Sequence, residues 1–406
     1  MKRNIDTLMK KMKIDAIYAE GASSRDTTVY YLFNGVTITG HYLKKRGKPA
    51  YVIHYPIERE EAKKTGLKCI NINTYDAKKI YDRYKDSVKA HAVVTKHIFA
   101  DHNVKGRVVF YGNSSPGSGY AYLRQLVKLD RNIKIVHEQH KSLITLARET
   151  KDEKEVDRIK KAGSGVRKAF NAAITGVRSM KVKNDVIVKK NGKKLLIGDL
   201  KNLLRKELYA QNLFDTEGMI VAQGRDAGVP HNSGKDREVV KLGKTIVFDI
   251  FPQERGGGYF FDFTRTICFG YAPKNVIKHF RIVCEAQDYA FDILRVGTRT
   301  VSIERKLCKF FEKMGHTTFL TDPKTQVGYC HNLGHGIGLN VHESPTFGLS
   351  KTNTDKIVPG MVFTVEPGVY YPHHGFGIRL EDIVYVSRTG KIINLTNYPR
   401  KLVVEL

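Results

Sequence analysis

Carboxylate side chains interrupt two apolar runs in the second half of this sequence. Asp249 and Asp262 lie within Thr245–Phe251 and Tyr259–Phe263, which a Gln-Glu-Arg-Gly-Gly-Gly segment joins. This pattern predicts a β-hairpin with a glycine-rich turn. Burying an unpaired carboxylate is costly, and two facing carboxylates repel each other. A shared cation would resolve both problems, although each aspartate could instead pair with an arginine or point to solvent.

Histidines gather further along, in a stretch too rich in glycine to form a stable helix. Within residues 329–345 lie His331, His335 and His342. Glycines there would let the backbone approach a ligand or another strand closely. A single histidine is more often structural than a ligand, but three so close together favour a site.

Two glutamates follow. Glu366 ends an apolar run and precedes a Pro-Gly turn, and a buried glutamate needs a partner. We predict one long strand over 377–386, in which alternation places Arg379 and Glu381 on one face. These two could simply pair with each other. Alternatively, Glu381 could bind a metal ion while Arg379 orients a substrate or a carboxylate.

These side chains together offer many oxygen donors and one nitrogen donor: Asp249, Asp262, His335, Glu366 and Glu381. Such a set suits two adjacent divalent cations, with Mn²⁺ or Co²⁺ favoured over Zn²⁺ or Fe²⁺. Two cations about 3.5–4 Å apart can share one water, lower its pKa to yield hydroxide, and polarise a carbonyl. The pattern therefore predicts a hydrolase.

The order of these motifs resembles that of the pita-bread metallopeptidases, which include methionine aminopeptidase, Xaa-Pro aminopeptidase, prolidase and the metal-free creatinase. The resemblance covers about residues 145–406 and is carried by FDIFP, DFTRT, GHGIGL, TVEPG and IRLED. It implies an α+β fold whose pita-bread catalytic domain, residues 145–406, contains a mainly antiparallel sheet. Residues 1–142 are more weakly similar to the creatinase- or prolidase-type N-terminal α/β domain.

The resemblance also implies a role for each matching residue. Five would bind two metal ions, with two of them bridging: Asp249, Asp262 (bridging), His335, Glu366 and Glu381 (bridging). Glu366 would also act as general base or proton shuttle. The remaining catalytic or substrate-binding positions would be His231, His331, His342 and Arg379. Of these, His231 and His342 match the histidines that contact the scissile peptide and stabilise its tetrahedral intermediate.

The motif HNLGHGIG, with His331 four residues before His335, resembles the branch that cleaves next to proline. The implied activity is hydrolysis of the bond between an N-terminal residue and a following proline, as in a Xaa-Pro aminopeptidase or a prolidase. The interval from Asp249 to Asp262 is longer than the one common in the family. Because the extra residues lie at the turn, we expect ligation to survive and the rim of the site to differ. Creatinase is disfavoured because its site lacks this complete carboxylate set.

The chain has 406 residues and a formal net charge of +28. Its lysines are spread in short groups without a nucleic-acid motif, so nucleic-acid binding should be incidental at most. The expected partners are a peptide with proline second and a second copy of the chain in a homodimer. Two alternatives stay open: a non-catalytic pita-bread protein that binds RNA or protein, and a creatinase-like small-molecule hydrolase.

Several classes of protein are disfavoured. No apolar run reaches the roughly 20 residues that span a bilayer, so no membrane association is expected. The N-terminus lacks an apolar signal core, which predicts a cytoplasmic location. The five scattered cysteines form no CxxC pair, which argues against a disulfide framework or a thiolate zinc site.

The first part of the chain alternates predicted strands with helices, as in an α/β domain. We predict strands at 15–19, 50–54, 69–72, 92–95, 107–110 and 133–136. No cluster of acids, histidines or cysteines within this part suggests a site. A densely charged segment at 148–154, followed by an amphipathic helix over 152–174, places the domain boundary near residue 145.

Overall fold

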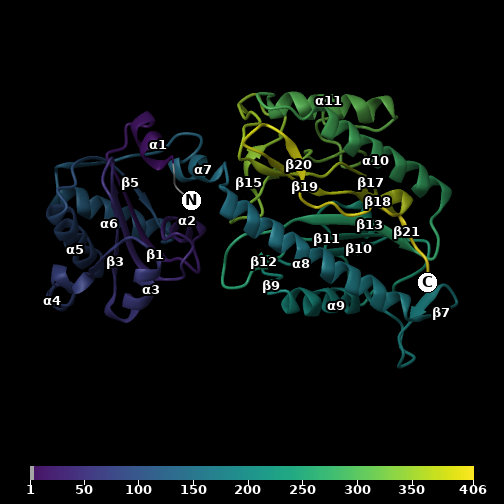
Figure 1. Cartoon of the computed structure of the whole chain (residues 1–406), viewed down its shortest axis with the longest axis horizontal. Coiled ribbons are helices and arrows are strands. Elements are labelled where there is room, and N and C mark those ends of the chain that lie inside the picture. The colour runs from purple at the N-terminus through teal and green to yellow at the C-terminus, as the bar shows by residue number, and fades with distance from the viewer. Residues whose placement is uncertain (1–3) are drawn as a thin grey trace. The chain divides into compact units, whose positions relative to one another are not determined.

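The computed structural model describes residues 4–406 and contains two compact units (Figure 1). The first unit ends at Arg148, and the second comprises Glu149–Leu406. Both combine helices with sheets, and the α+β class predicted from the sequence is confirmed for the chain. Among residues 4–406, no helix combines the length and the apolar character that crossing a bilayer requires.

The first unit contains a six-stranded mixed sheet in the order β4-β3-β2-β1-β5-β6. Its strands are β1 (Ala16–Ala22), β2 (Thr39–Lys45), β3 (Ala50–His54), β4 (Lys68–Asn71), β5 (Gly106–Tyr111) and β6 (Ile133–Ile135). Its α-helices are α1 (Ile5–Lys11), α2 (Thr27–Leu32), α3 (Arg59–Lys64), α4 (Ala77–Arg83), α5 (Ser87–Asp101), α6 (Pro116–Leu129) and α7 (Leu143–Arg148). Strand β1 is central, antiparallel to β2 and parallel to β5.

The predicted strand at 92–95 is wrong, because these residues lie inside α5. The run Ala-Val-Val-Thr is too short for its periodicity to separate a strand from a buried helix segment. The Asp86 side chain accepts hydrogen bonds from the N–H groups of Val88 and Lys89 and so caps the helix. Ala90, Val94 and Ile98 are buried at the four-residue spacing of one helix face.

The second unit is built on two sheets, with the strand orders β10-β11-β13-β21 and β15-β14-β16-β19-β20. The first contains β10 (Ile220–Gln223), β11 (Thr245–Ile250), β13 (Phe263–Phe269) and β21 (Val403–Val404). The second contains β14 (His335–Gly336), β15 (Glu343–Thr346), β16 (Val362–Val365), β19 (Asp382–Val386) and β20 (Ile392–Asn394). All pairs are antiparallel except β13 with β21. The mainly antiparallel sheet predicted for this part is therefore confirmed.

Three short pairs of strands, four α-helices and two short 3-10 helices complete this unit. The pairs are β17 (Gly368–Tyr371) with β18 (Phe376–Arg379), β9 (Leu213–Phe214) with β12 (Gln253–Glu254), and β7 (Lys181–Lys183) with β8 (Val186–Val188). The α-helices are α8 (Glu153–Arg178), α9 (Ile197–Ala210), α10 (Lys274–Ile293) and α11 (Thr300–Lys313). Helices α10 and α11 share one buried apolar cluster with the five-stranded sheet.

The long helix α8 packs against β11, which carries Asp249, and β13, which begins just after Asp262. It begins with a capping box between Asp152 and Glu155, which satisfies N–H groups at its first turn. The ring of Phe170 packs edge-to-face on Phe248 and Phe263, at centroid distances of 5.4 and 5.2 Å. Each such aromatic pair contributes about 0.5–1.5 kcal/mol beyond its buried area. The helix therefore holds β11 and β13 in place through these contacts.

Two strand predictions need correction. The predicted strand Tyr259–Phe263 is wrong, since β13 begins only at Phe263 and Asp262 lies just before it. The residue paired with Asp249 is Thr264 rather than Asp262. The predicted single strand over 377–386 is also wrong, because β18 ends at Arg379 and β19 begins at Asp382. Glu381 lies in this break and not in a strand, so its side chain need not point to the same face as that of Arg379.

Candidate active site

All nine residues singled out from the sequence line one cavity of about 660 Å³ in the second unit. They are His231, Asp249, Asp262, His331, His335, His342, Glu366, Arg379 and Glu381. They come from both sheets and from the segments between the strands. The structure thus brings the whole set together, although the roles assigned to these residues stay a prediction.

Asp249 lies on β11 and is 8% exposed. Its Oδ2 accepts a hydrogen bond from Arg379 Nη2 at 2.6 Å, whereas its Oδ1 has no hydrogen-bond partner among residues 4–406. Arg379 also donates to Tyr370 Oη at 2.6 Å and to Thr264 Oγ1 at 3.2 Å. The pairing of Asp249 with an arginine therefore occurs, but it occupies only one carboxylate oxygen.

Asp262 and Glu381 meet where the two sheets adjoin. The Glu381 N–H donates to the Thr264 carbonyl at 3.1 Å, and the Thr264 hydroxyl donates to Glu381 Oε2 at 2.8 Å. Both carboxylates are buried, at 4% exposure for Asp262 and 1% for Glu381. Asp262 Oδ1 and Glu381 Oε1 are buried without a hydrogen-bond partner among residues 4–406.

His335 and Glu366 face this pair from the five-stranded sheet. His335 Nε2 lies 3.3 Å from Glu366 Oε1 and 3.8 Å from Asp262 Oδ2. Its backbone N–H donates to Thr364 Oγ1 at 3.0 Å, and the Thr364 hydroxyl donates to Glu366 Oε1 at 3.2 Å. Strand β14, which carries His335, and strand β16, which ends just before Glu366, therefore hold these two side chains next to each other.

The glycines around His335 allow this close approach. A Cβ atom at Gly334 would overlap the carbonyl oxygen of Thr364, and one at Gly336 would overlap that of Ser344. Only glycine lets β14 lie this close to its neighbours. The expectation that these glycines serve a close backbone approach is confirmed.

The remaining histidines lie around the same cavity. His331 Nε2 lies 3.1 Å from Tyr370 Oη, and the ring of His342 lies 4.2 Å from that of His335. His231 is exposed and follows Pro230, whose carbonyl lies 3.4 Å from Arg379 Nη1. Imidazole groups thus line the space in front of the carboxylates.

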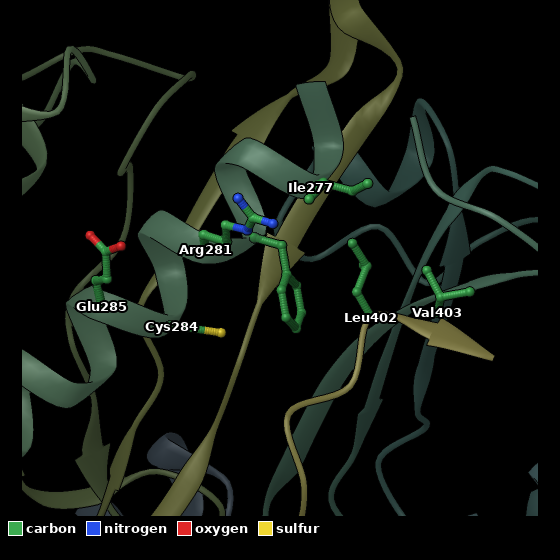
Figure 2. A pocket seen from close by; sticks show the side chains of 7 residues that line it. Ile277, Arg281, Cys284, Glu285, Leu402 and Val403 are labelled. Carbon is green, nitrogen blue, oxygen red and sulfur yellow. The ribbon is translucent and has the colours of Figure 1, made fainter. Parts of the chain in front are cut away.

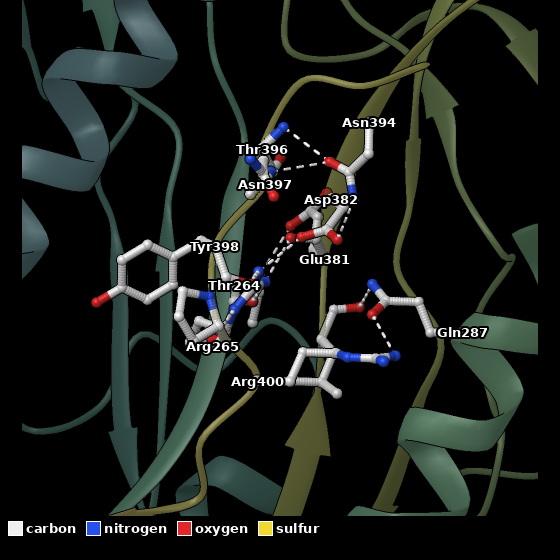
Figure 3. Close-up of polar contacts among 12 residues, drawn as sticks. Thr264, Arg265, Gln287, Glu381, Asp382, Asn394, Thr396, Asn397, Tyr398 and Arg400 are labelled. Carbon is white, nitrogen blue, oxygen red and sulfur yellow. Dashed lines mark hydrogen bonds and ion pairs between the residues drawn. The ribbon is translucent and has the colours of Figure 1, made fainter. Parts of the chain in front are cut away.

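The buried side chain of Arg265 connects the segment that carries Asp262 to the segment that carries Glu381 (Figure 3). Arg265 Nη1 donates to the carbonyls of Thr264 and Glu381, each at 2.8 Å. Its Nη2 donates to Asp382 Oδ1 at 2.7 Å and to the Tyr398 carbonyl at 2.8 Å. These charge-assisted bonds fix the break between β18 and β19 against β13.

Burial and mutual repulsion disfavour the ionised carboxylates. Burial raises the pKa of Asp262 well above its usual value, and the nearby Glu381 and Asp249 raise it further. Burial also raises the pKa values of Glu366 and Glu381 well above normal, although Arg379 opposes both shifts. Of the described residues that line the cavity, Arg379 is the only lysine or arginine, against six acids. The site therefore has a deficit of positive charge.

Burial favours the neutral form of His331, His335 and His342. Burial lowers the pKa values of His331 and His335 to about 3, and the neighbouring His342 contributes to the shift at His335. Burial also lowers the pKa of His342. A neutral imidazole is the form that binds a metal ion, so His335 is in the ligating state at neutral pH.

Divalent cations fit this set of donors. Asp262, His335 and Glu381 each offer a ligand atom, and these atoms lie within 4.8 Å of one another. Within this cavity, three buried carboxylate oxygens have no hydrogen-bond partner among residues 4–406: Asp249 Oδ1, Asp262 Oδ1 and Glu381 Oε1. Leaving buried acceptors unsatisfied is costly, and bound cations would satisfy them.

A second hollow, of about 440 Å³, lies between α10 and the C-terminal residues (Figure 2). Its walls are mostly apolar, with Arg281 and Glu285 as the charged members of the described lining. It contains none of the nine residues and offers no comparable set of donors.

Tyr370 and Thr264 belong to the site but were not singled out from the sequence. Tyr370 connects Arg379 to His331, and Thr264 connects Arg379 to Glu381. A tyrosine in an apolar strand and a threonine close to an aspartate are common, so residue type gave no signal. Their roles depend on strand register, which only the folded chain reveals.

Known proteins are similar in sequence to all or part of this chain. The Xaa-Pro dipeptidase of Pyrococcus horikoshii is 27% identical over 406 residues, covering 99% of this chain and 98% of that protein. A probable dipeptidase PepE of Mycobacterium tuberculosis is 29% identical over 257 residues, which is 63% of this chain and 61% of that protein. The chain thus matches less than two thirds of the length of that relative.

Solved structures share the fold over nearly the entire chain. A Xaa-Pro dipeptidase from Bacillus anthracis superposes with a TM-score of 0.76 at 22% identity, covering 99% of this chain and 98% of that one. An X-Pro aminopeptidase from Thermotoga maritima gives a TM-score of 0.74 at 24% identity, covering 98% and 100%. The model of metallopeptidase family M24 matches residues 157–388, which include all nine residues of the cavity. This chain therefore belongs to metallopeptidase family M24.

Proposed function

We propose that this chain is a peptidase that uses two divalent cations to hydrolyse the bond between an N-terminal residue and a following proline. It would act as a Xaa-Pro aminopeptidase or as a prolidase. The observation that carries the proposal is the group of four carboxylates and one histidine in this cavity, with three buried, unsatisfied oxygens and one balancing arginine. Similar proteins named Xaa-Pro dipeptidase support the choice of substrate.

Five residues would hold the cations: Asp249, Asp262, His335, Glu366 and Glu381. When bound, the cations would supply an activated water and polarise the carbonyl of the scissile bond. The identity of the metal is part of the proposal, with Mn²⁺ or Co²⁺ favoured over Zn²⁺ or Fe²⁺ because oxygen donors dominate.

Glu366 is positioned to move a proton. Its Oε1 accepts a hydrogen bond from the Thr364 hydroxyl, and its Oε2 lies 3.9 Å from His331 Nδ1. Burial favours its protonated form, so a proton taken from water would be retained and then donated. The scissile nitrogen is the ring nitrogen of proline, which carries no hydrogen in the peptide and departs as a secondary amine once it is protonated. Glu366 would donate that proton.

Other residues would bind and orient the peptide. His231 and His342 would donate hydrogen bonds to the carbonyl oxygen as negative charge develops on it. Arg379 would hold Asp249 in place through the 2.6 Å contact. Phe251 and Val341 give the cavity apolar surface that suits a pyrrolidine ring.

The test compares rates on Ala-Pro, on a pentapeptide with proline second, and on Ala-Ala, with and without a chelator. The proposal expects proline substrates to be cleaved much faster than Ala-Ala, and the chelator to stop the reaction. Cleavage of the dipeptide alone would identify a prolidase, and cleavage of the pentapeptide a Xaa-Pro aminopeptidase. Equal rates with Ala-Ala, or full activity in the chelator, would refute the proposal. The homodimer stays a prediction that light scattering can test.

A further inference from the structure

The first unit contains a cavity of its own, of about 320 Å³, with two histidines and a glutamate in its wall. It lies at the C-terminal ends of the parallel strands β1 and β5, where Glu20 and Tyr111 contribute to its lining. Ligands of α/β sheets characteristically bind at the carboxyl ends of strands. Glu20, His41 and His91 therefore occupy a position suited to a ligand.

The donor atoms of these three residues converge on one carboxylate oxygen. Glu20 Oε2 lies 2.7 Å from His91 Nε2 and 3.5 Å from His41 Nδ1. One ligand atom from each of the three residues lies within 4.8 Å of the others. Tetrahedral ligands at about 2.1 Å from zinc stand roughly 3.4 Å apart. The contact between Glu20 and His41 already has this spacing, and a small rotation of His91 would give it to the contact between Glu20 and His91.

The surrounding residues hold the three side chains in place. Glu20 pairs with His41 in the register of β1 and β2, so both point to the same face of the sheet. His91 comes from α5 and stacks on Tyr122, with the ring centroids 4.4 Å apart. The Tyr18 hydroxyl lies 2.9 Å from His41 Nδ1, where a cation would take its place. His41 Nε2 has no hydrogen-bond partner among residues 4–406, so no contact there fixes the tautomer.

The charge of the cavity also favours a cation. None of the 69 lysines and arginines is among the described residues that line it. Burial by itself would raise the pKa of Glu20, but its contacts with His41 and His91 outweigh burial and lower the pKa to about 2. The cavity thus presents an ionised carboxylate in a chain whose net charge is +28.

We propose that Glu20, His41 and His91 bind one divalent transition-metal cation, with zinc as the best match. Two imidazoles and one carboxylate form a known zinc-binding set, and three protein ligands leave a fourth position for water or a small ligand from the cavity. This site is separate from the carboxylate-rich cavity of the second unit, since the two share no lining residue. No site was expected in the first part of the chain, and the proposal departs from that expectation.

The test measures zinc bound to full-length protein in which the other cavity is disabled by Asp262→Asn and Glu381→Gln. After loading with micromolar zinc and gel filtration, elemental analysis should find about one zinc per chain. Adding Glu20→Gln or His91→Phe should reduce this to nearly none. The phenylalanine keeps an aromatic ring against Tyr122, and Glu60→Gln, at an exposed glutamate of α3, is the matched control. Circular dichroism checks that each variant is folded.

Two further results separate this proposal from the peptidase proposal. In the chain that is otherwise unaltered, Glu20→Gln should lower the zinc content by one equivalent while leaving Xaa-Pro hydrolysis unchanged. In the protein that carries Asp262→Asn and Glu381→Gln, cobalt in place of zinc should give the visible absorption of a tetrahedral site, and adding Glu20→Gln should abolish it. The proposal is overturned if the doubly substituted protein retains no zinc, or if Glu20→Gln retains as much zinc as Glu60→Gln.

Discussion

The two histidine-containing cavities differ in how their carboxylates are balanced. In the first unit, Glu20 contacts two imidazoles, and these contacts lower its pKa to about 2. In the second unit, four carboxylates of the candidate centre face one arginine, and the pKa values of Asp262, Glu366 and Glu381 rise well above normal. The carboxylate of the first cavity is therefore balanced by its neighbours, whereas the carboxylates of the second cavity repel one another and would be balanced by bound cations.

This difference bears on the chemistry that each cavity suits. In the first cavity one ion would replace the contacts that Glu20 makes with His41 and His91, and its binding would release any proton that these imidazoles hold. Crowded carboxylates instead hold acidic groups at raised pKa values, which is the arrangement that proton transfer near neutral pH requires. We therefore assign the hydrolytic function to the second cavity only.

The largest effect should come from Asp262→Asn. This change removes a negative charge from the centre of the carboxylate group, and Xaa-Pro hydrolysis should fall by about 10³-fold or more. Steady-state rates and the metal content of the same sample measure the effect. Asp157→Asn, at a 73% exposed aspartate of α8, is the control and should be silent. Wild-type rates in Asp262→Asn would remove this residue from the mechanism.

Arg379→Met should destabilise the fold more than any other single change at the site. It leaves Asp249 buried without its partner, which should lower the free energy of unfolding by about 3–5 kcal/mol in metal-free protein. Urea titration with a chelator present measures this, and bound cations should reduce the loss. Arg388→Met, at an exposed arginine paired with Glu153, is the control. A loss no larger than that of the control would show that Asp249 does not depend on Arg379.

Glu304 tests how a buried carboxyl behaves without any cation. It accepts a hydrogen bond from Leu333 N–H at 2.7 Å and forms no ion pair among residues 4–406. Burial raises its pKa from 4.5 to about 7. Because the folded state binds this proton more tightly, the contribution to stability is complete below pH 4.5 and is lost as the pH rises through 7.

Glu304→Gln should remove that dependence. The difference in unfolding free energy between wild type and variant should shift by about 3 kcal/mol between pH 4.5 and 8, in favour of wild type at low pH. Denaturant titrations at several pH values, with a chelator present, measure the shift. Parallel pH profiles for the two proteins would mean that Glu304 keeps an ordinary pKa.

Tyr370→Phe should have a smaller effect, since it removes only a hydroxyl. That hydroxyl contacts Arg379 and His331, so its loss should loosen both and lower kcat/KM by about tenfold. Tyr371→Phe, at the next residue, removes a hydroxyl that contacts His316 instead and provides the control. Equal kinetics in the two variants would assign Tyr370 a purely structural role.

Glu20→Gln should change hydrolysis least, by less than about twofold, because Glu20 belongs to the other cavity. Rates on Ala-Pro with saturating Mn²⁺ check this. A large loss of activity would mean that the two cavities are coupled.

Much of the candidate centre was predictable because its residues break local patterns. Asp249 interrupts an apolar run, and Gly334 and Gly336 flank His335, so residue type and spacing marked these positions. Helix α8 was equally clear, since its capping box and apolar stripe are local features. In each case the information lies within a few residues of the chain.

Features that depend on long-range pairing were not predictable. Glu20 and His91 are 71 residues apart, and β2, which carries His41, was missed altogether. The break between β18 and β19 follows from the contacts of Arg265 with Thr264, Glu381 and Asp382. An apolar run gives no sign of such a break, so periodicity indicated one continuous strand.

Anomalous X-ray scattering from crystals of the Mn²⁺-loaded protein tests the central claim most directly. We expect two strong peaks in the cavity of the second unit, in contact with Asp249, Asp262, His335, Glu366 and Glu381. A cavity without peaks, in protein that still cleaves Xaa-Pro peptides, would contradict the account.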